Sequence, residues 1–95
     1  MCRVLCENPA RLYGCWPRKG VIAPGGDADI VVYDPAASGV ITAADQVQNV
    51  DYTPYEGMET AGSIARVYLR GQLAVDRGRT LETEGRFIPR GKNQL

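Results

Sequence analysis

The sequence predicts a small, mainly β domain with short helices at its N-terminal end. Its 95 residues are 44% hydrophobic and 23% charged, which is the ordinary balance of a single folded domain. From Gly20 onward, short apolar runs alternate with Gly, Pro and Asp, a pattern typical of strands joined by tight turns. The main helix signals lie in residues 1–19.

The N-terminal segment, residues 1–19, carries signals for two short helices. Residues 4–6 indicate the end of the first. Asn8 can cap a second helix, with Pro9 in its first turn, and Gly14 can end it in the left-handed conformation. The side chains expected to be buried are Leu12 and Tyr13.

Residues 20–78 hold the predicted strands. Residues 21–23 form a short strand, residues 24–26 (Pro-Gly-Gly) a turn, and residues 28–33 a strand that Asp34-Pro35 ends. Because residues 28–33 are almost continuously apolar, we expect this strand to be covered on both faces. Val40 and Ile41 form another brief strand, after which Thr42 can cap a helical turn.

The stretch SIARVYLRGQLAVDRG, residues 63–78, is the clearest hairpin in the chain. A two-residue turn at Arg70-Gly71 pairs Tyr68 with Leu73, whereas a three-residue loop pairs Leu69 with Leu73 and Val67 with Val75. The sequence leaves both registers open. Residues 79–95 read as a polar, Gly-rich tail. Its expected anchors are Phe87 and Ile88.

Charge and cysteine content exclude several classes of partner. Eleven Lys and Arg balance eleven Asp and Glu, so the basic surface that nucleic acid needs is not expected. No apolar run approaches the ~20 residues of a membrane span. Three cysteines, Cys2, Cys6 and Cys15, are an odd number and favour reduced thiols in a cytoplasmic protein. We expect them to be buried as small hydrophobic residues, since two thiols on one helix face would half-fill a zinc site.

A search for chemistry finds no catalytic, cofactor-binding or metal-binding residue. The chain has no histidine, so the commonest general base and metal ligand is absent from the sequence. Asp27 and Asp29 follow the Gly25-Gly26 turn and are interpreted as structural turn-capping residues. The other side chains considered are the loop carboxylates Asp45, Asp51, Glu56 and Glu59, interpreted as solvated charges, and Tyr52 and Tyr55, interpreted as anchors of an ordered loop.

Three stretches resemble a known family. NPARLYGCWPRKGVIAPGGDADIVVYDP (residues 8–35) resembles the segment of the amidohydrolase superfamily that leaves the catalytic barrel and enters a small β-sandwich domain. NVDYTPYEGM (residues 49–58) and GRFIPRG (residues 85–91) resemble its dihydropyrimidinase, or hydantoinase, branch, which includes the non-enzymatic collapsin response mediator proteins.

The resemblance implies a fold and an activity for a longer parent protein. It implies a partial composite β-sandwich without the catalytic (β/α)-barrel, and a parent that opens cyclic amides with hydroxide held by divalent metal, expected to be zinc. In the family, histidines, a carboxylated lysine and an aspartate on the barrel hold the metals. Neither Lys19 nor Lys92 matches that lysine, so no catalytic residue is carried over.

Two functions remain at this stage. The chain is either a catalytically silent C-terminal portion of such a hydrolase or an interaction and assembly module related to the non-enzymatic members. Either way we expect a protein partner, an identical chain or the barrel portion of the parent, because the strands that would complete the sandwich are not recognised in this sequence.

Overall fold

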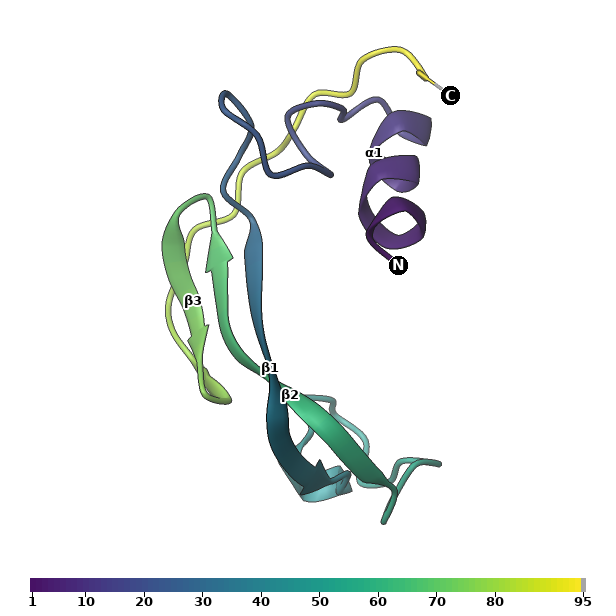
Figure 1. The fold of residues 1–95 in the computed structure, drawn as a ribbon, viewed down its shortest axis with the longest axis vertical. Coiled ribbons are helices and arrows are strands. Elements are labelled where there is room, and N and C mark those ends of the chain that lie inside the picture. The colour runs from purple at the N-terminus through teal and green to yellow at the C-terminus, as the bar shows by residue number, and fades with distance from the viewer. Residues whose placement is uncertain (95) are drawn as a thin grey trace.

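The computed structural model describes residues 1–94 and is organised around one four-stranded antiparallel sheet (Figure 1). The strands lie in the sheet in the order β1-β2-β3-β4. The elements are a π-helical turn (Arg3–Glu7), α1 (Asn8–Leu12), β1 (Ile30–Val40), a 3-10 turn (Ala43–Asp45), β2 (Glu59–Leu69), β3 (Gln72–Asp76) and β4 (Arg79–Thr80). The predicted mainly β fold with helix at the N-terminal end is confirmed.

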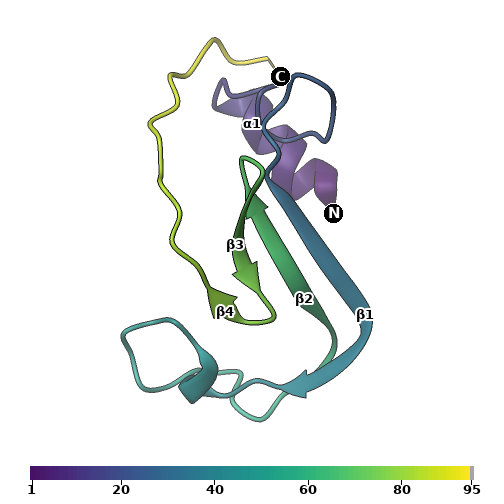
Figure 2. The ribbon, with the colours of Figure 1, turned by 90° about the vertical axis from the view of Figure 1, so that its left-hand side faces the viewer.

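The helical segment and the sheet lie end to end. Figures 1 and 2 show α1 beyond the end of the sheet at which β2 turns into β3, with the connection between β1 and β2 at the opposite end. The tail after β4 runs back along the sheet toward α1. No helix among residues 1–94 is long and apolar enough to cross a membrane.

The predicted break between two N-terminal helices is wrong. Asn8 has helical dihedral angles (φ −62°, ψ −45°) and donates its N–H to the carbonyl of Arg3, so the π-helical turn continues directly into α1. Pro9 lacks an N–H and occupies the first turn of α1, where the wider π turn before it has already shifted the bonding pattern. Gly14 (φ +77°) ends the helical segment as predicted.

β1 is longer than the sequence predicted. It continues through Asp34-Pro35 to Val40, because its pairing with β2 shifts between Asp34 and Ser38 and residues 35–37 leave the ladder. A proline without an N–H is tolerated at such an irregularity. The separate strand predicted at residues 21–23 is not formed, since these residues lie in the loop that approaches β1.

The β2–β3 hairpin combines features of both predicted registers. Arg70 and Gly71, both with positive φ, form a two-residue turn that pairs Leu69 with Gln72 and Tyr68 with Leu73. A register shift follows, after which Val67 pairs with Val75, as the longer loop predicted.

Five apolar side chains gather on one face of the sheet, and we call this patch the apolar face. It contains a row of three valines, one from each of β1, β2 and β3, and a neighbouring cross-strand pair from β1 and β2. Its members are Val31, Val67 and Val75 in the row, and Tyr33 and Ile64 in the pair. Val31, Tyr33 and Ile64 are 58%, 57% and 50% exposed, so the cover predicted on both faces of this strand is wrong for residues 1–94.

Other side chains predicted to be buried are also exposed. Among residues 1–94 the only buried hydrophobic residue is Ala10, and a single sheet with one short helix has no second layer to cover the rest. The corrected residues are Cys2 and Cys6, which are exposed, Cys15, which is half-buried, and Leu12 and Tyr13, which are exposed. Of the two expected anchors of the tail, Phe87 is exposed and Ile88 is half-buried.

Glycine at position 62 is required by the packing of Tyr33. Gly62 has φ +91°, and a Cβ at this position would overlap the Tyr33 hydroxyl and ring. The Tyr33 hydroxyl donates a 2.9 Å hydrogen bond to the carbonyl of Ala61. The ring therefore lies against bare backbone of β2, where any larger residue would displace it.

Candidate functional site

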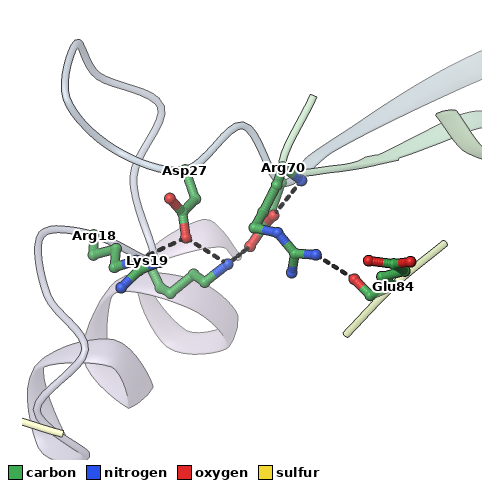
Figure 3. Close-up of polar contacts among 6 residues, drawn as sticks. Arg18, Lys19, Asp27, Arg70 and Glu84 are labelled. Atoms are coloured by element: carbon green, nitrogen blue, oxygen red, sulfur yellow. Dashed lines mark hydrogen bonds and ion pairs between the residues drawn. The ribbon is translucent and has the colours of Figure 1, made fainter. Parts of the chain in front are cut away.

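The densest group of charged side chains lies where the loop before β1 meets the β2–β3 turn (Figure 3). The Lys19 Nζ lies 2.9 Å from Asp27 Oδ2 and 2.5 Å from Asp29 Oδ2, and the Arg18 Nε lies 3.0 Å from Asp27 Oδ2. Arg70 joins the group through its backbone. We call Arg18, Lys19, Asp27, Asp29 and Arg70 the polar junction.

The junction connects three segments that are distant in sequence. Asp29 Oδ1 accepts a 2.9 Å hydrogen bond from the backbone N–H of Arg70, and Gly71 N–H donates to the carbonyl of Ala28 at 3.0 Å. The Arg70 guanidinium donates to the carbonyl of Glu84 in the tail (Figure 3). The loop before β1, the hairpin turn and the tail are thereby held together.

Local sequence explains how the junction forms. Gly25, with φ +88°, turns the chain back, and Asp27 N–H donates to the carbonyl of Arg18 at 2.9 Å. This turn returns the two aspartates to the basic pair that precedes them by about ten residues. The turn predicted at residues 24–26 is therefore present.

Electrostatics keep Lys19, Asp27 and Asp29 charged. Burial alone would lower the pKa of Lys19, but hydrogen bonds to Asp29 and Asp27 raise it above its usual value. A hydrogen bond from Lys19, aided by Arg18, lowers the pKa of Asp27 despite some desolvation. Desolvation opposes the same change in Asp29, whose pKa is lowered by hydrogen bonds from Lys19 and the Arg70 N–H.

The charges compensate one another, which limits the chemistry available. Carboxylates with lowered pKa values are weak proton acceptors at neutral pH, so Asp27 and Asp29 are poorly suited to general base catalysis. Their oxygens already accept from Lys19, Arg18 and a backbone N–H. The arrangement is suited to fixing the end of the sheet.

The remaining predicted carboxylates are engaged in the connection between β1 and β2 or exposed. Glu56 Oε2 accepts a 2.6 Å hydrogen bond from Ala43 N–H, and Asp45 Oδ2 accepts a 2.7 Å bond from the Thr42 hydroxyl. Thr42 thus precedes a 3-10 turn as expected but makes no capping bond to its backbone. Asp51 and Glu59 are exposed.

The aromatic and sulfur candidates lie apart from the junction. Tyr52 and Tyr55 are 68% and 58% exposed in the connection between β1 and β2. The thiols of Cys2 and Cys6 lie on the exposed N-terminal helical segment, and Lys92 is exposed in the tail. Within residues 1–94, no three His, Cys, Asp or Glu side chains come together in a group that could hold a metal ion.

A shallow hollow adjoins the junction. It is lined by Ile22, Pro24 and Ile30 among others, and its volume is about 230 Å³. Pockets that enclose small molecules commonly have volumes of roughly 300–1,000 Å³. The hollow is therefore smaller than a typical ligand site.

Sequence reasoning found the two aspartates but not their partners. Arg18 and Lys19 were interpreted only as part of a break in the chain, although a basic pair followed by a Pro-Gly-Gly turn and two aspartates is a signal for a local ion-pair cluster. The contribution of Arg70 comes from its backbone N–H, 41 residues beyond Asp29. No side-chain pattern reports such a bond.

Comparison with known proteins places this chain among the amidohydrolases. The sequence model described as "Amidohydrolase family" matches residues 1–74. A D-hydantoinase of Streptomyces coelicolor is 51% identical over 72 residues, 76% of this chain and 15% of that protein. A D-hydantoinase of Ralstonia pickettii is 41% identical over 91 residues, 94% of this chain and 20% of that protein.

Solved structures agree in fold. A D-hydantoinase structure superposes with a TM-score of 0.84 at 42% identity, over 92% of this chain and 20% of the other. The L-hydantoinase (dihydropyrimidinase) of Arthrobacter aurescens superposes with a TM-score of 0.81 at 31% identity, over 85% of this chain and 18% of the other. The chain spans at most about a fifth of the length of these relatives. With most of its length matched in sequence and in fold, the chain belongs to the amidohydrolase family.

Proposed function

We propose that this chain is a scaffold portion, from the C-terminal small domain, of a hydantoinase or dihydropyrimidinase type hydrolase and that it is catalytically silent by itself. One observation carries the proposal: the carboxylate oxygens of Asp27 and Asp29 are already engaged within the chain. They bind Lys19, Arg18 and the Arg70 N–H. The parent reaction would be the opening of a cyclic amide, as the names of the relatives suggest.

The metal that the family generally uses does not fit the donors of this chain. Asp27 and Asp29 each contact the Lys19 ammonium, so a cation already lies against one oxygen of each carboxylate. The sequence has no histidine to complete a ligand set, and the described residues hold no group of three potential ligands. We therefore assign no step of the reaction to these residues.

The runner-up function is an interaction and assembly module without catalytic activity in any parent. The exposed apolar face supports it, because contiguous apolar surface commonly marks a protein contact. Under either function we propose a protein partner, the remainder of a hydrolase or an identical chain. The balance of eleven basic and eleven acidic residues argues against nucleic acid.

The proposal is tested on the purified chain by metal analysis and by a ring-opening assay with hydantoin and dihydrouracil. We expect substoichiometric metal and no turnover above buffer, with a full-length D-hydantoinase as the positive control. Stoichiometric tightly bound metal together with turnover would overturn the assignment. The genomic sequence upstream of the Met1 codon separates the two functions, since a barrel with metal-binding histidines would identify an enzymatic parent.

A further inference from the structure

The end of the tail lies against the turn that follows α1. Gly91 N–H donates a 2.7 Å hydrogen bond to the carbonyl of Gly14, and Gln94 N–H donates a 3.0 Å bond to the carbonyl of Arg11. The Gln94 side-chain amide donates a 3.1 Å bond to the carbonyl of Trp16. We call Arg11, Gly14 and Trp16 the carbonyl site, because each offers a backbone oxygen to the tail. Carbonyls at the end of a helix lack intrahelical partners and are free to accept such bonds.

The carbonyl site is formed by local contacts that do not involve the tail. The N–H groups of Cys15 and Trp16 donate to the carbonyl of Ala10 at 2.8 and 3.1 Å, and Ala10 is buried. The Arg11 guanidinium lies over the Trp16 ring, 4.1 Å from its centre, and its Nε lies 3.1 Å from Glu7 Oε1. These contacts fix the backbone that carries the three carbonyls. A bound peptide would therefore bear most of the ordering cost, and the site little of it.

The fit between the tail and the carbonyl site depends on glycine at position 14. Gly14 has φ +77°, and a Cβ at this position would overlap the backbone of Gly91. The requirement at Gly91 is weaker, since a Cβ there would lie 3.5 Å from the carbonyl oxygen of Gly14, which is an ordinary contact. The site thus needs a backbone N–H from the tail at this position, whereas a small side chain on the tail is tolerated.

The docked end of the tail is separate from the part that is held at the sheet. The Arg70 guanidinium donates to the carbonyl of Glu84, at the β2–β3 turn. Residues 85–90 then lead to the carbonyl site, and Figure 2 shows the tail returning to the end of α1. Within this range Ile88 is half-buried and the other residues are exposed. The contact at the carbonyl site is therefore local, and its loss would leave the bonds between the strands intact.

We propose that the carbonyl site is a peptide-docking site and that the tail is its resident ligand, which a free peptide of the same chemistry can replace. The ligand class is an extended basic peptide. It presents a backbone N–H to Gly14 and, three residues later, a side-chain amide to Trp16. Residues 85–94 carry basic side chains and no acidic one, which suits a site made of carbonyl oxygens at a helix end.

The test uses the full chain with Gly91→Pro, which removes the N–H that binds Gly14 and so releases the tail from an unchanged site. A fluorescently labelled peptide of residues 85–94 is added, and its anisotropy is measured. We expect saturable binding with a dissociation constant at least about tenfold lower than for the wild-type chain, whose tethered tail competes at an effective concentration on the order of millimolar. The matched control is Gly91→Ala, which keeps the N–H and should bind the peptide as weakly as the wild type.

Two further measurements locate the bound peptide. A peptide that itself carries Gly91→Pro should bind the Gly91→Pro chain about tenfold more weakly than the wild-type peptide, because it lacks the same N–H. The wild-type peptide should shift the NMR amide signals of residues 10–16. Adding Gly14→Ala to the chain should abolish binding, because the new Cβ would overlap the backbone of the peptide.

Far-UV circular dichroism reports the fold of each variant. An unfolded Gly91→Pro chain overturns the proposal, because the tail would then be part of the fold and not a ligand. No saturable binding to the folded chain, equal binding of the two peptides, or shifts confined to the sheet would overturn it as well. If Gly14→Ala is unfolded, the NMR shifts decide the location. None of these results bears on metal content or ring opening, so the proposed function can fail separately.

Discussion

The polar junction and the apolar face differ in whether their side chains find partners within this chain. In the junction, two carboxylates, an ammonium, a guanidinium and a backbone N–H satisfy one another, so the contact needs no other molecule. On the apolar face, Val31, Tyr33 and Ile64 are at least half exposed, so their burial requires a second surface. The junction is satisfied within the chain, whereas the apolar face is open.

The largest effect on stability is expected at Gly62, where the Tyr33 ring of the apolar face lies against backbone that carries no side chain. Gly62→Ala would place a Cβ inside the Tyr33 ring at φ +91°, so we expect the free energy of unfolding to fall by about 3 kcal/mol or more. Denaturant unfolding at one fixed protein concentration measures the change.

The matched control for this change is Gly57→Ala. Gly57 has φ +83° but no atom near the added Cβ, so it reports backbone strain alone, about 1 kcal/mol. Equal losses in the two variants would show that Tyr33 does not pack on Gly62.

The second effect concerns the junction. Lys19→Met keeps the aliphatic stem but leaves Asp27 and Asp29 without their shared cation, and we expect the free energy of unfolding to fall by about 1 kcal/mol because solvent screens these partly exposed groups. Arg18→Met removes a single, more exposed ion pair and should cost less. A larger loss for Arg18→Met than for Lys19→Met would contradict the central position of the ammonium.

The pH dependence of stability should follow the junction at both extremes. The folded-state pKa values of Asp27 and Asp29 lie below the ordinary 3.8, so their stabilisation is present above that pH and is lost as pH falls through the lowered values. The folded pKa of Lys19 lies above 10.5, so its contribution is present below that pH and is lost as pH rises through the raised value.

Between these limits the contribution of the junction should be constant. The contribution of the junction is isolated by measuring urea midpoints against pH for the wild type and for Lys19→Met. All other titrating groups are common to both chains, so their effects cancel in the difference. The difference between the two curves should shrink at both ends. A difference that changes near neutral pH would require another titrating group.

Local features of the fold could be predicted from the sequence, whereas features set by distant contacts could not. The Gly25 turn, the helix end at Gly14 and the turn at Arg70-Gly71 depend on neighbouring residues, and each is present. The path of β1 past Pro35 depends on a register shift against β2, which the sequence of β1 does not encode by itself. The apolar run at residues 30–33 indicated that cover is needed, but it could not say whether this chain supplies it.

The same distinction applies to the site. Asp27 and Asp29 were interpreted as turn-capping residues from the glycine turn beside them, but the bond from the Arg70 backbone links residues 41 apart. Asp29 and Arg70 come together only once β1 and β2 have paired in register. Cys2 and Cys6 show the converse error, because the general preference of cysteine for burial was applied to side chains that are exposed in this chain.

The smallest effect is expected for the contact between the tail and the segment after α1. The Gln94 side chain donates a 3.1 Å hydrogen bond to the carbonyl of Trp16. Two backbone bonds hold the same part of the tail: Gln94 N–H donates to the carbonyl of Arg11, and Gly91 N–H donates to the carbonyl of Gly14. Gln94→Ala removes only the side-chain bond, so we expect a loss of about 0.5 kcal/mol. Amide hydrogen exchange at residues 10–16 should be faster in Gln94→Ala than in a Lys92→Ala control, because the bond lies next to the end of α1. Unchanged exchange would mean that the backbone bonds of the tail hold it in place without the Gln94 side chain.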